Sequence, residues 1–289
     1  MFKTAINHFS ILTISLLFSL LLQSSYVNSS QLNEIHEQQR TDLFITLHTL
    51  RVSSFDILND YYAFVSSGNG EYELIDVKSR INEFDSNNSL LLNILNESGI
   101  PYSEYEGLKN DSENFKNKVA LLLKYSVEDG YTDMRVLQET VELSSALSKS
   151  VSVFLNKFRV SNTSQINLIR DCFELDLLLT KMQGIYLSRA NFSDNQFTSS
   201  AVGDEDNDLE RMTANLNQRM LELEASIKEL NINEEELVIL EKIQTKWFFI
   251  ENLYMNYKEK SAPFIVHNQS SKISLLLSKF ISLIYEKHS

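Results

Sequence analysis

The chain has 289 residues, with 26 Lys or Arg, 39 Asp or Glu and a formal net charge of −13 at pH 7. Its 7 Gly and 2 Pro make up about 3% of the residues, against a usual ~12%. Tight turns and β-hairpins depend on Gly and on positive φ angles, so this composition argues against β-sandwich and doubly wound α/β folds. Collagen-like, cysteine-stapled and low-complexity chains are excluded by the same counts. An all-α protein of one or two domains remains.

The amino terminus has the pattern of an export signal. Residues 9–22 read FSILTISLLFSLLL, and Lys3 is the one charged side chain before residue 30. A run of this length is short for a membrane span, which needs about 20 residues, but it suits a signal peptide. Val27 and Ser29 fit the small positions of a signal peptidase site, so we expect residues 1–29 to be cleaved. An uncleaved anchor is the alternative, and in either case these residues are the expected membrane contact.

The cysteine content indicates the compartment. Cys172 is the only cysteine, and a eukaryotic secreted chain of this length without a disulfide is unusual. We therefore expect export to a bacterial periplasm or cell envelope. Cys172 lies in the helical stretch INLIRDCFELDLLL, where it is expected to be a small core residue.

Apolar residues recur at intervals of three and four residues through the rest of the chain, and this pattern predicts about eight helices. The seventh is expected to begin at Asn233, with Glu236 as its capping-box partner, and the last follows the break at Pro263. Sustained half-heptad spacing predicts the near-parallel packing of helix bundles. The eight expected helices cover approximately residues 31–65, 74–95, 105–122, 134–158, 168–186, 209–230, 233–257 and 264–285.

The breaks between these segments suggest the domain organisation. They fall at residues 99–101, 128–130, 160–162 and 191–208, the last of which is polar, acidic and without helical period. Eight helices are more than one four-helix bundle holds. We expect two up-down helical bundles stacked in tandem, residues 30–160 and 161–289, after the signal peptide or anchor of residues 1–29. Long helices shared by both bundles are the alternative.

Patterns that carry catalytic or metal chemistry are missing. The five histidines lack the Glu-x-x-His spacing of di-iron bundles, and no G-x-S-x-G, P-loop or G-x-G-x-x-G occurs. We expect no enzymatic activity, no metal and no cofactor. Basic residues stand singly among carboxylates, which argues against nucleic-acid binding.

Two stretches carry a resemblance to a known family. Leu50-Arg51-Val52, followed by Asn59-Asp60-Tyr61-Tyr62, and the segment ENFKNKVALL at residues 113–122 are similar to elements of the double all-helical ligand-binding (DAHL) domain. That domain is the extracytoplasmic sensor of histidine kinases and related bacterial receptors. In the second stretch Phe115, Lys116 and Ala120 match, whereas Asn117 and Val119 depart from the expected Ser and Asn. Tandem-bundle sensors of the helical bimodular type are a close rival.

The resemblance implies an extracytoplasmic sensory protein that binds a small ligand and signals to a membrane partner, such as a sensor kinase. Receptors of this kind continue into a second membrane helix and an output domain, whereas this sequence ends at Ser289. We therefore expect either a stand-alone relative or a fragment of a receptor. A non-enzymatic structural or protein-interaction module of the cell envelope is the alternative function.

Five residues are candidates for ligand binding. Arg51 lies on the apolar face of the first helix, where a guanidinium can hold a carboxylate bidentately. A salt bridge within the protein, or a side chain that reaches solvent, is the favoured alternative. Tyr61, Tyr62, Lys116 and Trp247 are the next candidates, because amphipathic rings and single charges line pockets between helices. An aromatic stripe at helical spacing is more often plain core.

Overall fold

The computed structural model describes residues 37–157, 163–192, 209–229, 233–257 and 261–287. These residues form helices joined by turns, with no strand among them, which confirms the all-α fold class. The helices are α2 (Glu37–Ser66), α3 (Glu71–Glu97), α4 (Tyr102–Glu128), α5 (Met134–Lys157), α6 (Ser164–Asn191), α7 (Leu209–Glu229), α8 (Glu234–Met255) and α9 (Pro263–Glu286). The signal peptide or anchor expected at residues 1–29 lies outside the described part of the chain.

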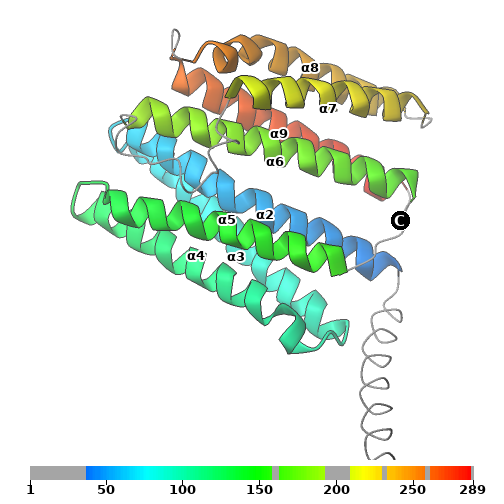
Figure 1. Ribbon diagram of the computed structural model, residues 1–289, viewed down its shortest axis with the longest axis horizontal. Helices are drawn as coiled ribbons and strands as arrows, with labels where there is room; N and C mark the ends of the chain where they lie inside the picture. Colours follow the sequence, from blue (N-terminus) through cyan, green and yellow to red (C-terminus); the bar gives the residue numbers. More distant parts are fainter. Residues whose placement is uncertain (1–36, 158–162, 193–208, 230–232, 258–260, 288–289) are drawn as a thin grey trace, which may run out of the picture.

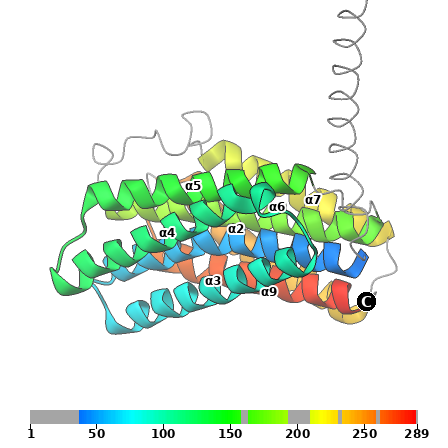
Figure 2. The ribbon, with the colours of Figure 1, turned by 90° about the horizontal axis from the view of Figure 1, so that it is seen from below.

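The helices lie roughly side by side in an elongated slab (Figure 1). α3 and α4 form one edge, α7 and α8 form the opposite edge, and α2, α5, α6 and α9 lie between them (Figures 1 and 2). α2 packs on α3 and α5, and α9 packs on α6 and α8. The two groups α2–α5 and α6–α9 meet laterally, through α2 against α6 and α9. The boundary expected near residue 160 falls in the segment 158–162, which is not described, so the division into two domains stays a prediction.

The half-heptad spacing marks the buried seams of most helices. On α4 the residues spaced at alternating intervals of three and four from Tyr105 to Leu122 are all buried, namely Tyr105, Leu108, Ser112, Phe115, Val119 and Leu122. On α3 only some residues of this spacing are buried. Val77, Phe84, Leu91 and Leu95 are buried, whereas the other positions of the same spacing are partly exposed. The rings of Phe84 and Phe115 meet with their centroids 5.4 Å apart.

Small side chains bring α5 close to α2. The hydroxyl oxygens of Ser144 and Ser54 lie 3.0 Å apart and form a buried hydrogen bond. This contact agrees with the close helix approach that the small Ser residues in the fourth predicted helix, residues 134–158, indicate. Cys172 is fully buried, in agreement with its expected place in the core.

Several helix ends follow local rules that the sequence displays. At the start of α8, Glu236 N–H donates to Asn233 Oδ1 at 3.0 Å, and Asn233 N–H donates to Glu236 Oε2 at 2.7 Å. This geometry confirms the predicted capping box. The end of α2 is followed by Gly68 and Asn69, with φ of 72° and 64°, a left-handed turn that favours these two residue types. Asn191, expected to begin a loop, instead ends α6 and donates to the carbonyl oxygens of Tyr62 and Leu187.

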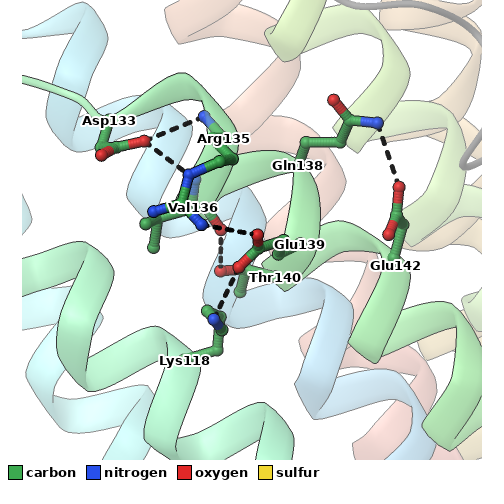
Figure 3. Close-up of polar contacts among 8 residues, drawn as sticks. All are labelled: Lys118, Asp133, Arg135, Val136, Gln138, Glu139, Thr140 and Glu142. Carbon is green, nitrogen blue, oxygen red and sulfur yellow. Dashed lines mark hydrogen bonds and ion pairs between the residues drawn. The ribbon is translucent and has the colours of Figure 1, made fainter.

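The start of α5 is fixed by Asp133 and by an ion pair to α4 (Figure 3). The backbone N–H groups of Arg135 and Val136 each donate to Asp133 Oδ1 at 3.0 Å. Glu139 accepts from Lys118 at 2.6 Å and from Arg135 at 2.9 Å, and the hydrogen bond from Lys118 lowers the pKa of the Glu139 carboxyl. These contacts account for the charged cluster as a structural feature of the α4–α5 pair.

Among the helices that the structure describes, none combines enough length with enough apolar character to cross a membrane.

Candidate functional site

α2 occupies the centre of the molecule and buries more polar side chains than any other described helix. It contacts α3, α5, α6 and α9, so most of its circumference faces protein rather than solvent. Buried polar groups require hydrogen-bond partners, since an unsatisfied one costs about 1–3 kcal/mol. The polar contacts of α2 with its neighbours are therefore the candidate functional site. Its buried polar residues are Thr41, Thr46, His48, Arg51, Ser53, Ser54, Asn59 and Asp60.

The first polar group surrounds Arg51, the leading candidate from the sequence. Its Nη2 donates to Glu174 Oε1 on α6 at 2.5 Å and to His48 Nδ1 at 2.9 Å, while its Nη1 donates to Ser152 Oγ on α5 at 3.2 Å. The Nε atom is buried without a hydrogen-bond partner among the described residues. Glu174 of the same chain thus supplies a carboxylate to Arg51, and this internal salt bridge is one of the two structural roles favoured from the sequence.

His48 completes this group as a neutral ring. It stacks on Phe173 of α6, with centroids 4.9 Å apart and planes 15° apart, and it meets Phe44 edge-on. Burial holds the pKa of His48 well below its usual value, and the positive charges of Arg51 and Arg170 lower it further. A neutral Nδ1 is the form that accepts a hydrogen bond from the Arg51 guanidinium.

The second polar group lies about two turns further along α2, where α3, α6 and α9 come together. Arg80 of α3 donates from Nε to Asp60 Oδ2 at 3.3 Å and from Nη1 to Glu83 at 3.0 Å. His267 of α9 places its Nε2 3.7 Å from Asp60 Oδ1. Its Nδ1 is 2.8 Å from the Nε2 of Gln183 on α6.

Buried carboxyl groups give this second group its unusual electrostatics. Burial raises the pKa of Asp60 to about 6, and burial likewise raises the pKa of Asp176 on α6 to about 6. The pKa of Asp56 is raised well above its usual value by burial and then by the charge of Asp176. The pKa of His267 is lowered, because burial outweighs the nearby carboxylates. Perturbed values of this kind cluster at functional sites, although structural ion pairs also produce them.

The structure does not bring the five sequence candidates together. Arg51, Tyr61 and Tyr62 lie on α2, but Lys116 lies on α4 and Trp247 on α8, at opposite edges of the molecule (Figure 1). Each makes contacts of its own. The Tyr61 hydroxyl pairs with Ser126 at 2.7 Å and with Thr132 at 3.0 Å. The Tyr62 ring lies 6.4 Å from that of Tyr61, Lys116 pairs with Asp85 at 2.7 Å, and Trp247 Nε1 donates to Asn217 at 2.6 Å.

Sequence reasoning did not single out the second polar group, which combines side chains of α2, α3, α6 and α9. Asp56 and Asp60 flank the apolar positions Ile57 and Tyr61, and Asp176 interrupts an apolar run on α6. A charged residue between buried positions was the only sequence feature that marked these Asp residues. This feature could not predict the site, because the partners Arg80 and His267 are remote in sequence and their contact depends on how the helices pack.

No group of three or more His, Cys, Asp or Glu side chains suited to a metal ion occurs in the described ranges. The expectation of a protein without metal, cofactor or enzymatic activity therefore stays a prediction, as do all five ligand-binding candidates. Comparisons with protein-family models, curated proteins and solved structures found no match to this chain. The likeness to DAHL sensor domains thus rests on the two stretches of sequence alone.

Proposed function

We propose that this protein is an extracytoplasmic, ligand-binding helical-bundle sensor that passes a signal to a membrane receptor or another envelope partner, such as a sensor kinase. The observation that carries the proposal is the mixed contact of α2 with α6 and α9, which joins the two groups of four helices. Polar pairs such as Arg51 with Glu174 alternate there with apolar contacts such as Phe55 with Leu177. The bundle cores on either side are apolar.

This arrangement suits a two-state response. Buried hydrogen bonds and ion pairs hold only in particular geometries, so a helix that shifts must exchange one complete set of partners for another. A ligand that favours one set therefore moves α6–α9 relative to α2–α5. The size of the shift in population is limited by the difference between the ligand's affinities for the two packings.

The proposed location rests on residues 1–29. The apolar run at residues 9–22 and the small residues Val27 and Ser29 fit cleavage and release into a periplasm. Mass spectrometry of the protein from its native envelope would then find Ser30 as the first residue. A mature chain that still begins at Met1 would favour the anchor instead.

Ligand binding is tested with the purified full chain in a thermal-shift screen. The panel would contain amino acids, dicarboxylates and polyamines, because the polar groups of α2 present both charges. We expect one chemical class to raise the melting temperature in a saturable way, as mass action requires for a ligand of the folded state. A panel without any saturable shift would count against a small-ligand sensor.

The helix movement is tested by spin-label distances in a Cys172→Ala background. Labels at the exposed positions Glu106 on α4 and Glu241 on α8 report on the two groups of helices. The matched control pair, Glu106 with Glu142 on α5, lies within one group. The active ligand should change the first distance and leave the second unchanged; no change in either would contradict the proposed signal.

A protein-interaction module is the second candidate, and exposed aromatic residues favour it. Phe248 and Phe249 on α8 are 80% and 61% exposed, and Phe264 at the start of α9 is 73% exposed. Exposed apolar clusters commonly mark interaction surfaces. This function predicts that Phe248→Ser with Phe249→Ser abolishes binding to the partner while leaving every thermal shift with small molecules intact.

A further inference from the structure

Ionisable groups from three helices meet where α2 packs against α3, α6 and α9. Asp56 and Asp60 come from α2, Arg80 from α3, and Asp176 from α6. With all three Asp ionised, the formal charge is 1 − 3 = −2, since Arg80 supplies the one positive charge among these four residues. Arg80 is also shared with Glu83 of its own helix. The junction therefore holds more negative charge, on buried and partly buried carboxylates, than its guanidinium neutralises.

The hydrogen bonding of Asp176 indicates independently that this carboxyl group favours its protonated form. This residue is 6% exposed, and its Oδ1 is buried without a hydrogen-bond partner among the described residues. Ser274 of α9 donates a hydrogen bond to the same carboxyl group. One turn along α6, the fully buried Thr180 Oγ1 also lacks a partner. A buried acceptor without a donor is costly, and a protonated carboxyl group nearby provides such a donor.

We propose that this junction is a proton-operated contact, in which protonation of Asp56, Asp60 or Asp176 tightens the packing of α2 against α6 and α9. Protonation removes the repulsion between the carboxylates and turns an acceptor into a donor. Loss of the proton restores the surplus charge and loosens the junction. The proposal goes beyond small-ligand sensing and does not depend on it, since the proton itself is the bound species.

Other charged groups face the junction and modify its response. From α3, the carboxylates of Glu73, Asp76 and Glu83 add negative charge around Asp60 and His267. From α9, His267 acts in the opposite direction, because its buried ring resists protonation. α6 adds the neutral Gln183, which is bonded to that ring. The three Asp groups therefore favour the packed form on acidification, whereas His267 opposes it.

The pH range follows from the two groups with values near neutrality. The pKa values of Asp60 and Asp176 are about 6 in the folded protein, against about 3.9 for an unfolded Asp. The folded state therefore binds more protons between about pH 4 and pH 6, and the stabilisation from these carboxyls is lost as pH rises through about 6. A change from pH 7.5 to pH 4 spans the whole transition, and a change from pH 7.5 to pH 5 covers about half of it.

The test uses Asn as a permanent mimic of the protonated carboxyl. In the full chain, Asp176→Asn should raise the folded-to-unfolded equilibrium constant by roughly tenfold or more at pH 7.5, and this advantage should shrink as the pH falls below 6 and disappear near pH 4. Urea titrations at several pH values measure both. Asp56→Asn is the second variant, and it separates an effect of the whole junction from a local effect of one substitution on folding. Asp85→Asn, which removes a surface ion pair with Lys116, is the matched control and should show the same difference at both pH values.

Hydrogen exchange then measures the packing directly. After correction for intrinsic rates, amides of α6 and α9 should be better protected at pH 5 than at pH 7.5 in the original sequence, and this difference should be smaller in Asp176→Asn, in which Asp56 and Asp60 still titrate. The proposal is overturned if both Asn variants are less stable than the original sequence by the same margin at pH 5 and pH 7.5. A ligand found in the thermal-shift screen would not rescue it.

Discussion

Arg51 on α2 and Glu174 on α6 form an ion pair whose two members lie in different surroundings. The Nη2–Oε1 distance is 2.5 Å, but the Arg51 side chain is 5% exposed whereas that of Glu174 is 35% exposed. The guanidinium therefore depends on the carboxylate for its charge balance more than the carboxylate depends on the guanidinium. Removal of Glu174 should therefore destabilise the protein more than removal of Arg51.

We expect Glu174→Ala to destabilise the protein by about 2–3 kcal/mol, because it leaves a buried positive charge without its partner. Arg51→Met should cost less, about 1–2 kcal/mol, since an apolar side chain of similar length replaces the charge and Glu174 retains access to water. Urea unfolding followed by far-UV circular dichroism would measure both changes.

The control for this pair is the exposed ion pair of Lys279 with Glu235, whose side chains are 56% and 55% exposed. Either partner of an exposed pair should be replaceable by Ala within about 0.5 kcal/mol. If Arg51→Met proved the more damaging of the two α2–α6 variants, the assigned roles of the pair would be wrong.

Acid should destabilise the protein through His48. The pKa of this ring is lowered in the folded state by burial and by Arg51, whereas an unfolded His binds a proton below about pH 6.5. The unfolded state therefore binds more protons below that pH, and the stability supplied by neutral His48 falls as pH decreases. In His48→Gln the stability relative to the original sequence should improve steadily from pH 7.5 to pH 5. A difference that stayed constant across this range would contradict a neutral His48.

Tyr61 should stabilise the fold through its hydroxyl group. That hydroxyl links α2 to Ser126 of α4 and to Thr132, so Tyr61→Phe should cost about 1–2 kcal/mol. Tyr62→Phe is the matched control, because its hydroxyl makes no hydrogen bond to another described residue, and its cost should be below about 0.5 kcal/mol. Equal costs in chemical denaturation would show that the hydroxyl contacts of Tyr61 contribute nothing.

The capping box of α8 gives a local test. Asn233→Ala removes the acceptor for Glu236 N–H and should cost about 1 kcal/mol, whereas Asn233→Ser or Asn233→Asp should retain most of the stability. Thermal unfolding of the three variants measures this difference. Three equal melting temperatures would mean that α8 does not depend on its cap.

The Arg51 group shows how far the candidate site could be predicted. The position of Arg51 among apolar residues indicated a guanidinium partly inside the bundle, and the favoured structural role was a salt bridge within the protein or a side chain that reaches solvent. The structure supplies that salt bridge through Glu174, which lies 123 positions further along the chain. Periodicity within a helix defines which face is buried, but it does not specify which residue of another helix lies opposite.

The sequence alone determined that the chain is helical, where most helices begin and end, and which side of each is buried. These properties depend on local contacts, on the 3.6-residue period and on caps such as Asn233, all of which act within a few positions. The tertiary structure decided which polar groups meet at the centre. Asp60, Arg80, Asp176 and His267 come from four helices, and their electrostatics arises only when packing removes water from around all of them together.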